Sequence, residues 1–557
     1  MRRRTTWIGA AAAGAATLVT LGAARRRLQL SQAKHRSLTG HVRMAKRIAS
    51  LIPFYDYDEW TFFRADDPPE EIAAAREAGF RRLAALYATR FAKSAALTAE
   101  AREGLSDLQF TGAYRVPFQF GRIVRENLPG GSFITVSSGV TLTDLDGNIL
   151  YDLAGSYGVN LLGYDAYKGF IREAVDQVDA LGPVLGSFHP VVADNIARLK
   201  VLSGMDEISF HMSGTEAVMQ AVRLARYHTG RPRIVRFAGA YHGWWGEVQP
   251  GIGNPVPADR TLTLADMSEK TLAVLASRKD IACVLVNPLQ ALHPNKSAPS
   301  DGALVDSSRS AGVDRTAYAA WLQRLAETCR ANGIVFILDD VFTGFRLAQG
   351  GAAGYFDVQP DMVTYGKTLG GGLPVGVICG RAELMKRYRD DRPADICLAR
   401  GTFNAHPYVM GAMNAFLRAY DAAEVRALYD WLDERWDERR AEFNRCMTEA
   451  GVPVTAANLS SIWTIGFTSP SRYNWMLQYY LRAEGLHLSW VGTGRLIFSL
   501  NYTDADFADV VERFVRAADT MKADGWWHEN PALTDKAIRR RVLKEIFAVK
   551  RGRKPAA

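Results

Sequence analysis

The chain has 557 residues, of which 48% are hydrophobic and 23% charged; these are ordinary globular values that leave room for one large domain or two unequal ones. Its five cysteines fall in no metal-binding or redox spacing, so we predict no metal site and reduced, mostly buried thiols of a cytosol-like compartment. No basic-aromatic pattern indicates nucleic-acid binding, so nucleic acid is not an expected partner.

The net charge of +9 is concentrated at the two ends of the chain. Up to Tyr55 there are eleven Lys and Arg and no acid, and from Lys536 onward there are nine Lys and Arg and one acid. The ends thus carry +11 and +8, which leaves −10 on the body between them. Basic ends suit contact with an anionic membrane surface or an acidic protein partner. The alternative for the C-terminal end is a solubilising tail.

The first predicted element is an apolar segment near the start of the chain. Eighteen uncharged residues, Trp7 to Ala24, lie between two arginine triplets, and Ala and Gly make the segment weakly hydrophobic. Three interpretations stay open: a membrane anchor over residues 7–24, a secretory or twin-arginine signal, and a segment lying on the membrane surface. If it spans, the positive-inside rule favours a catalytic body on the cytoplasmic side, because more Lys and Arg follow the segment than precede it.

Further along, the pattern of the body predicts an α/β fold. Residues 68–97 have the spacing of a helix opened by proline and acids, and residues 140–155 form two short strands around an Asp146-Gly147 turn. Continuous apolar strands then alternate with helices, which indicates a mostly parallel sheet covered by helices on both faces. After about Leu398 helices with shorter strands predict a second, smaller α+β domain.

Three features fall at the carboxyl ends of predicted strands, where open parallel sheets bind ligands. Ser213, Gly214 and Thr215 follow the strand ISFHM and open a helix; they form either a phosphate seat or an ordinary helix cap. Asp339 ends the strand IVFILD. Its carboxylate is either partly buried, which requires a partner, or part of a capping or surface aspartate pair.

The third feature is Lys367, which precedes Gly370, Gly371 and Gly372. It is either a surface loop lysine or a nucleophile in a setting that destabilises its ammonium. A phosphate seat, a carboxylate for a ring nitrogen and a lysine for an aldehyde together specify one ligand, pyridoxal 5'-phosphate.

The stretches SGTEAVMQAVRLARYHTGRPRIVRFAGAYHG and ILDDVFTGFRLAQGGAAGYFDVQPDMVTYGKTLGGGLPVG resemble class III aminotransferases of the type I pyridoxal-phosphate transferase fold, closest to the glutamate-1-semialdehyde 2,1-aminomutase branch. The resemblance runs from about Phe118 to Met521. It implies that Lys367 binds the cofactor aldehyde and then shuttles a proton. It further implies that Asp339 pairs with the ring nitrogen and that Ser213, Gly214 and Thr215 hold the phosphate.

The same resemblance assigns four more cofactor-binding residues. Tyr241 is expected to stack on the ring, Val341 to pack on its other face, and Gln290 to lie near the phenolic oxygen. Thr402 is expected to reach the phosphate of the neighbouring subunit's cofactor, which implies a homodimer with shared sites.

The chain also departs from the family pattern. It has Asp340 as the second acid and Asn287-Pro288-Leu289 where many members have Glu-Pro-Val, followed by an extra loop over residues 293–315. Gly494 replaces a glutamate of the aminomutase branch, beside Arg495, which meets a substrate carboxylate or phosphate or is a surface arginine. Gln119 lies where an arginine often binds a carboxylate. These departures resemble synthase-associated aminotransferase domains, which act on chains held by an acidic carrier protein.

We therefore expect an aminotransferase that uses an amino-acid donor and an aldehyde or ketone acceptor, free or carrier-bound. Intramolecular amine transfer, as in the aminomutase, and a catalytically idle scaffold are the alternatives. The expected segments are an anchor or signal-like segment (1–27), a helical extension (28–105), the N-terminal part of the small domain (106–160), the large cofactor-binding domain (161–397), the C-terminal small domain (398–530) and a basic tail (531–557).

Overall fold

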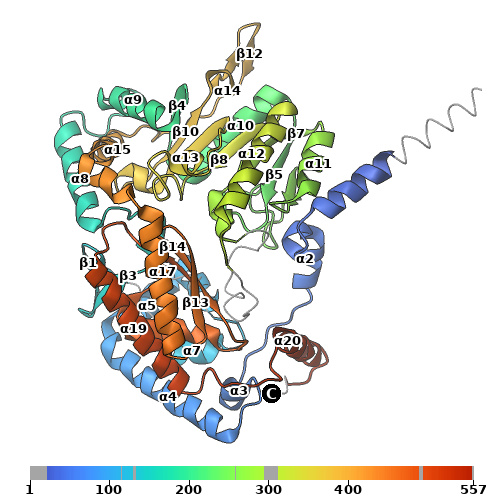
Figure 1. The fold of residues 1–557 in the computed structure, drawn as a ribbon, viewed down its shortest axis with the longest axis vertical. Coiled ribbons are helices and arrows are strands. Elements are labelled where there is room, and N and C mark those ends of the chain that lie inside the picture. Colours follow the sequence, from blue (N-terminus) through green and yellow to red (C-terminus); the bar gives the residue numbers. More distant parts are fainter. Residues whose placement is uncertain are drawn as a thin grey trace, which may run out of the picture.

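The computed structural model describes residues 22–114, 116–129, 133–257, 259–293, 311–488 and 494–554. A large sheet with its helices occupies the upper half of the view in Figure 1, and three smaller groups of elements occupy the lower half and the right-hand edge. Most of the predicted extra loop after His293 lies outside the described residues, as does the predicted apolar segment up to Leu21.

The large sheet has seven strands in the order β4-β10-β9-β8-β7-β5-β6. Only β10 runs antiparallel to its neighbours, so the prediction of a mostly parallel sheet is confirmed. The strands β7, β8 and β9 are buried along their whole length, as expected for a sheet covered on both faces. In chain order the strands are β4 (Glu207–His211), β5 (Arg233–Phe237), β6 (Thr261–Leu264), β7 (Ile281–Val286), β8 (Val335–Asp339), β9 (Met362–Gly366) and β10 (Gly376–Gly380).

Helices cover this sheet and complete the upper body (Figure 1). The helix α10 follows β4 directly and packs on β10, β9 and β7, while α15 packs on α8 and α9. These helices are α8 (Tyr164–Val178), α9 (Val191–Ser203), α10 (Gly214–Thr229), α11 (Glu269–Ser277), α12 (Arg315–Ala331), α13 (Gly351–Tyr355), α14 (Ala382–Met385) and α15 (Pro407–Tyr420). The hairpin β11 (Tyr388–Arg389) and β12 (Arg392–Ile396) projects from the top of the view.

Two smaller sheets lie below. One has the order β1-β2-β3-β15 and the other β13-β14-β16. The predicted turn between β2 and β3 is confirmed: the Asp144 carboxylate accepts the backbone N–H groups of Asp146 (3.0 Å) and Asn148 (2.9 Å), and Gly147 has φ 88°. The elements are β1 (Ile134–Ser138), β2 (Thr141–Asp144), β3 (Ile149–Asp152), β13 (Val454–Leu459), β14 (Ile462–Phe467), β15 (Leu486–His487), β16 (Arg495–Ile497), α16 (Ala423–Arg426), α17 (Leu432–Glu449), α18 (Leu477–Ala483) and α19 (Asp504–Ala523).

The N-terminal extension wraps around the edge of both halves. Residues 22–33 are helical, and Lys34 bridges to Leu264 at the edge strand β6. The helices that follow are α2 (Val42–Ala49), α3 (Glu59–Arg64), α4 (Glu70–Arg90), α5 (Ala92–Gly104), α6 (Ser106–Tyr114) and α7 (Gly121–Asn127). Among the described residues, no helix combines the length and the apolar character that crossing a membrane requires.

The single helix predicted over residues 68–97 is interrupted. Phe91 leaves the helical backbone (φ −122°, ψ 27°) and separates α4 from α5. Its fully buried ring packs on Tyr87 with 5.0 Å between the ring centroids, so the kink brings an aromatic side chain into the core. Periodicity alone does not reveal such a break, because the apolar spacing continues through it.

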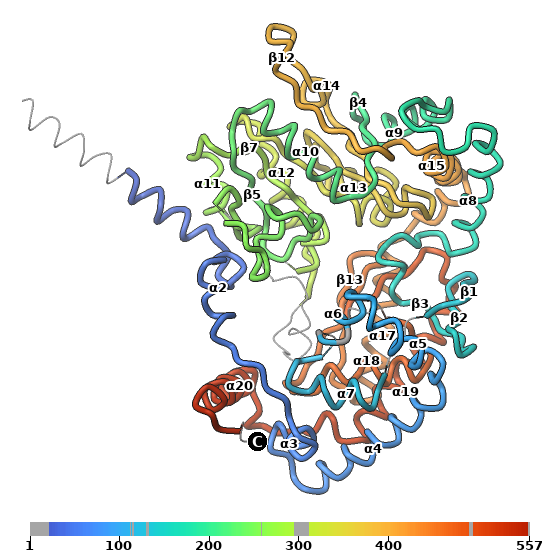
Figure 2. Tube along the Cα trace, turned by 180° about the vertical axis from the view of Figure 1, so that it is seen from behind, coloured from blue at the N-terminus to red at the C-terminus, as the bar shows by residue number. Residues whose placement is uncertain are grey.

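The C-terminal end forms a last helix, α20 (Asp535–Lys550), beside the N-terminal extension. Figure 2 shows α20 next to the segment that joins α2 to α3. The contact between them is built around Glu545, whose buried carboxylate accepts hydrogen bonds from the hydroxyls of Tyr55 (2.8 Å) and Tyr57 (2.6 Å) and pairs with Arg472 (2.7 Å). We call this contact the joint. The two ends of the chain are therefore held against the same part of the body.

Candidate active site

A cavity of about 790 Å³ opens where β4, β8 and β9 end. Strand ends meet at this edge because parallel strands point the same way, which is where open α/β sheets bind ligands. Seven of the nine predicted cofactor-binding residues line it: Ser213, Gly214, Thr215, Tyr241, Asp339, Val341 and Lys367. Gln290 and Thr402 are not among the lining residues.

Lys367 follows β9 directly and has a left-handed backbone (φ 49°). The turn after it depends on glycine: a Cβ at Gly371 (φ 61°) would lie 2.3 Å from the carbonyl oxygen of Ala412. Burial lowers the pKa of Lys367 to about 8, helped by the Arg346 cation and opposed by the Asp339 carboxylate. About a tenth of Lys367 is therefore a neutral amine at pH 7, far more than for an ordinary lysine, and this is the form that attacks an aldehyde.

Asp339 ends β8 and is almost fully buried, so its carboxylate needs partners. One oxygen, Oδ2, lies 2.7 Å from Nδ1 of His242, and the other accepts weak hydrogen bonds (3.3 Å) from the Thr364 hydroxyl and the Val341 N–H. The carboxylate also lines the cavity. The carboxylate is thus held in place by hydrogen bonds from the protein and is also accessible to a ligand in the cavity.

His242 is a site residue that the sequence reasoning missed. It is fully buried, and burial lowers its pKa, so the imidazole is neutral at physiological pH and Nδ1–H can donate to Asp339. The stretch AYHG contains the signal, but only its Tyr241 was predicted to bind the cofactor. A neutral donor orients the carboxylate without neutralising its charge, which keeps that charge for the ligand.

The predicted phosphate seat is the start of α10. The Ser213 hydroxyl caps the helix by accepting the N–H of Glu216 (3.2 Å). A Cβ at Gly214 would lie 2.7 Å from a methyl of Val341, and a Cβ at Gly243 would lie 2.5 Å from the Thr215 hydroxyl. Small residues therefore leave the first N–H groups of a long helix accessible from the cavity, and its dipole favours an anion there.

The remaining predicted residues are placed as follows. Tyr241 is about half exposed (53%), lines the cavity, and its backbone carbonyl accepts the Asn287 side-chain amide (2.9 Å). Gln290 lies on the short 3-10 helix Pro288–Leu292, where its buried amide donates to the carbonyl of Ala238. Asn287, from the departing NPL stretch, lines the cavity instead.

Asp340, the second acid of the pair, faces away from this cavity. It accepts the Thr343 hydroxyl (2.5 Å) and the Ala352 N–H (2.8 Å), and burial raises its pKa to about 7. It fastens the end of β8 to α13, which is a structural role distinct from that of Asp339.

Much of the remaining cavity wall is apolar. Val159, Phe342, Leu373 and Ile497 contribute to it, together with Tyr157 and Arg495. Arg495 therefore lies in the cavity wall, whereas Gln119 is buried elsewhere and is not among the lining residues. The wall combines room for a hydrocarbon chain with one guanidinium group that can bind an anion.

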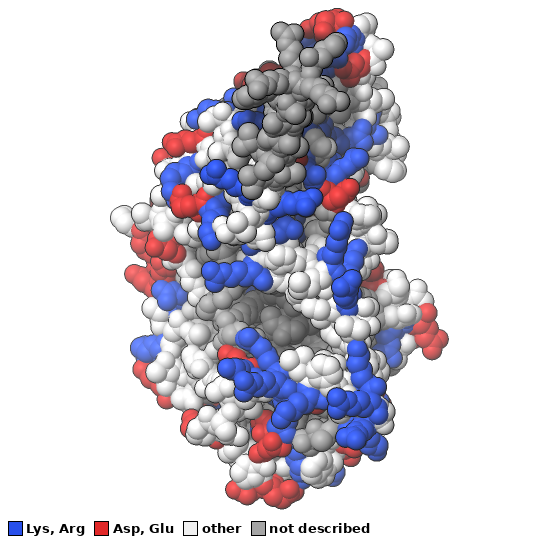
Figure 3. Space-filling model, turned by 90° about the vertical axis from the view of Figure 1, so that its right-hand side faces the viewer, with Lys and Arg blue, Asp and Glu red and all other residues white. Residues whose placement is uncertain are grey.

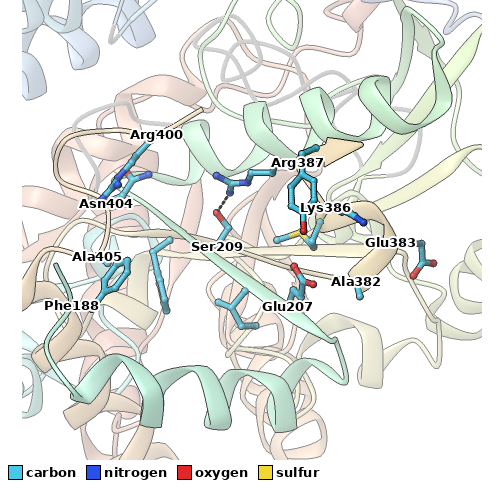
Figure 4. A pocket seen from close by; sticks show the side chains of 14 residues that line it. Phe188, Glu207, Ser209, Ala382, Glu383, Lys386, Arg387, Arg400, Asn404 and Ala405 are labelled. Atoms are coloured by element: carbon cyan, nitrogen blue, oxygen red, sulfur yellow. Dashed lines mark hydrogen bonds between the residues drawn. The ribbon is translucent and has the colours of Figure 1, made fainter. Parts of the chain in front are cut away.

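Thr402 is exposed and lies on the loop between β12 and α15. A second hollow of about 930 Å³ adjoins this loop, lined by its residues Arg400, Asn404 and Ala405 and by the start of β4 (Figure 4). Arg387 crosses that hollow and donates to the Ser209 hydroxyl at 2.6 Å. The loop thus borders a surface depression of the chain and not its main cavity.

The main cavity fits pyridoxal phosphate. The glycines at 214 and 243 leave a cradle at a helix N-terminus, a buried carboxylate faces the interior, and a lysine of lowered pKa lies on the same wall. Among the described residues no group of His, Cys, Asp or Glu has the arrangement of a metal site.

Comparison with known proteins identifies the family. Residues 124–518 match the model of "Aminotransferase class-III". The chain belongs to the class III aminotransferases. It is accordingly an enzyme of the pyridoxal-phosphate-dependent type I fold, with aminotransferase or aminomutase activity.

The chain is also similar to three individual proteins. A glutamate-1-semialdehyde 2,1-aminomutase of Nitratidesulfovibrio vulgaris is 31% identical over 68% of this chain and 90% of its own. A β-phenylalanine aminotransferase structure from Variovorax paradoxus is 25% identical, with a TM-score of 0.59 over 80% of this chain and 96% of its own. A glutamate-1-semialdehyde aminomutase structure from Pseudomonas aeruginosa PAO1 is 18% identical, with a TM-score of 0.63 over 80% of this chain and 99% of its own, and supports the fold.

Proposed function

We propose that the chain is an aminotransferase that moves an amino group from an amino-acid donor to an aldehyde or ketone. The observation that carries this proposal is the convergence of Lys367, Asp339 and the start of α10 on one cavity with an apolar wall. Bound pyridoxal phosphate supplies the electron sink for the reaction.

The chain's own residues then perform four tasks. Ser213 and Thr215, with the first N–H groups of α10, bind the phosphate, and Asp339 holds a proton at the ring nitrogen. Lys367 binds the cofactor aldehyde through its Nζ. Once Nζ is released from the aldehyde, it takes up and returns the proton of the substrate carbon. The Phe342 ring excludes water from Nζ, which lies 5.1 Å from the ring centroid.

We infer that Arg495 binds a carboxylate of the amino-acid donor. Its support is that it lines the same cavity as the cofactor-binding residues, together with apolar residues such as Ile497 that weaken competition from water. The substitution Arg495→Gln should raise KM for a carboxylate-bearing donor about 10- to 100-fold, the range for a lost charged hydrogen bond, with a smaller change in kcat. An amine donor without a carboxylate is the matched control. An equal loss with both donors would contradict the assignment.

Intramolecular amine transfer is the second candidate, favoured by the sequence identity to the aminomutase of N. vulgaris. The two reactions differ in their need for a separate donor. Product formation from an aldehyde or ketone only when an amino acid is added supports the aminotransferase. Conversion of an amino aldehyde with no added donor supports the aminomutase and would replace our proposal.

The acceptor and the attachment of the enzyme extend the proposal. We propose an aldehyde or ketone acceptor that is free or held on an acidic carrier protein, and assays of both forms of one carbonyl compound separate these cases.

We also retain the interpretation of residues 7–24 as a membrane anchor with the catalytic body on the cytoplasmic side. Its support is the run of uncharged residues between arginine triplets.

We further propose a homodimer in which Thr402 reaches the phosphate at the partner's site. The exposed loop that carries Thr402 also carries the exposed apolar side chains of Leu398 and Phe403, and Phe188 is exposed on the adjoining hollow. Exposed apolar groups of this kind favour a protein interface. Thr402→Ala should weaken cofactor affinity without changing the dimer mass in sedimentation; unchanged affinity would contradict the shared site.

A further inference from the structure

Both ends of the described chain lie on one side of the molecule. The helix of residues 22–33, α2 and α20 follow each other down the right-hand edge of Figure 1, and the view from behind in Figure 2 places them at the opposite edge, as the same side requires. Figure 3 faces this side, and Lys and Arg side chains gather on it. The two basic ends of the sequence thus contribute cations to the same side of the molecule.

The helix α20 is fixed by one stripe and exposes another. Ile538 and Glu545 are buried against the body, where Glu545 pairs with Arg472. On the outer face Arg540, Leu543, Lys544, Phe547, Lys550 and Arg551 are exposed at helical spacing. Leu543 and Phe547 are more than half exposed (53% and 57%) between these cations. The helix α20, which the ion pair between Glu545 and Arg472 fixes to the body, therefore exposes cations and large apolar side chains together to solvent.

The helix α2 repeats this pattern. Arg43 and Arg47 are exposed at i and i+4, and the apolar side chains of Met44 and Ile48 are exposed beside them, as is Leu51 just after the helix. The charge of Arg541 is not part of the surface, because Arg541 pairs with Asp67 at 2.6 Å. We name the exposed side chains of α2 and α20 described here the basic face.

We propose that the basic face docks on an anionic lipid bilayer, independently of the catalytic function proposed above. Interleaved cations and apolar side chains on surface helices match a bilayer interface, where headgroup charge attracts Lys and Arg and the acyl boundary accepts Leu, Ile and Phe. An acidic protein would match the cations but would gain less from isolated apolar side chains. The described chain begins at residue 22 with the helix on this same side (Figure 1).

The test uses the full chain and vesicle sedimentation. Partitioning is measured on phosphatidylcholine vesicles and on vesicles that also contain phosphatidylserine. The difference between the two reports the contribution of the cations, because neutral vesicles register apolar contacts alone. We expect the full chain to prefer the anionic vesicles and to lose that preference as salt rises. Arg540→Gln with Lys544→Gln should lower the anionic preference about 25-fold, the effect of two cations.

A charge-matched control is the pair Arg172→Gln with Lys200→Gln, exposed on α8 and α9 at the opposite side of the molecule. This pair should leave partitioning unchanged. Leu543→Ser with Phe547→Ser should weaken binding even at high salt, because it removes apolar burial and not charge. Thermal unfolding of each variant verifies that α20 stays docked.

Three results would overturn the proposal. One is equal partitioning of the full chain on neutral and anionic vesicles. Another is an equal loss in the α20 pair and in its control. The third is binding of a purified acidic carrier protein that depends on Arg540 and Lys544 while the vesicle preference does not, which would assign the basic face to a protein partner.

Discussion

The cavity and the joint between the chain ends each bury a carboxylate, with opposite consequences. At the joint, Glu545 is enclosed by two tyrosine hydroxyls and the Arg472 guanidinium, so its hydrogen bonding is satisfied within the chain. In the cavity, Asp339 is hydrogen-bonded to His242 and weakly to Thr364, and its carboxylate also lines the cavity. The enclosed Glu545 carboxylate contributes to the stability of the fold, whereas the Asp339 carboxylate, which borders the cavity, is available to bind a ligand.

The two regions also differ in how far apart in sequence their parts lie. The Tyr55 and Glu545 side chains that meet at the joint are 490 positions apart. In the cavity, Ser213, Asp339 and Lys367 lie at the ends of strands of one sheet, so topology brings them together. Substitutions in the cavity should therefore affect activity with little effect on stability, and substitutions at the joint should do the reverse.

The largest expected effect belongs to Lys367→Ala. It removes both the amine that binds the cofactor aldehyde and the base that moves the proton, so kcat should fall at least about 10⁴-fold. Single-turnover kinetics of the cofactor-loaded protein measures this loss. Lys200→Ala, at an exposed position on α9, serves as the control and should be neutral. Retention of more than a hundredth of the activity, about the effect of one minor catalytic group, would remove Lys367 from its assigned role.

Asp339→Asn should come next. The amide cannot hold the proton at the ring nitrogen, so kcat should fall about 10³-fold, the scale of one lost electrostatic contact with developing charge. The neighbouring Asp340→Asn is the sharp control: Asp340 does not line the cavity, and its raised pKa of about 7 makes it partly neutral already. The same kcat loss in both variants would erase the distinction between the two acids.

Glu545→Gln tests the joint. It leaves the buried Arg472 without its countercharge, so the free energy of unfolding should fall by about 3 kcal/mol. Chemical denaturation measures the change, and kcat at a temperature where the variant is folded should be unaltered. Glu529→Gln, exposed in the segment before α20, should change stability by less than about 0.5 kcal/mol. A stable Glu545→Gln variant would show that the joint does not hold the chain ends.

The smallest effect is a pH dependence. Because the pKa of Lys367 is lowered to about 8 from the ordinary 10.5, its neutral fraction should rise with pH up to about 8 and then level off. The rate at which cofactor-free protein takes up pyridoxal phosphate, followed by visible absorbance, should have the same shape. A rate that still rises tenfold per unit above about pH 9 would mean that the lysine is not desolvated.

The sheet and most of the cavity could be predicted from the sequence because both follow from local pattern. Asp339 ends a continuous apolar strand, and Lys367 and Ser213 follow closely after the ends of two others. The apolar runs of β7, β8 and β9 are themselves typical of strands buried on both faces. Those signals are short-range, so no long-range information was needed to place the three residues at one sheet edge.

Three features could not be predicted for physical reasons. A buried histidine that orients a carboxylate resembles any core histidine until the distance between His242 and Asp339 is known. The hydrogen bond from the Gln290 amide to the Ala238 carbonyl depends on the short helix after Asn287, which the local sequence pattern does not predict. The joint at Glu545 depends on contacts between distant segments, and the basic C-terminal sequence gives no sign of a buried acid within it.

The most direct test of the account is a visible absorption spectrum of the pyridoxal-phosphate-loaded protein, titrated with amino acids one at a time in the absence of acceptor. We predict that its yellow absorbance bleaches with one class of amino acid, releases one keto acid per site and returns when a carbonyl acceptor is added. Lys367→Ala should show none of these changes. A spectrum that no amino acid alters, in a protein that converts an amino aldehyde alone, would contradict the aminotransferase assignment.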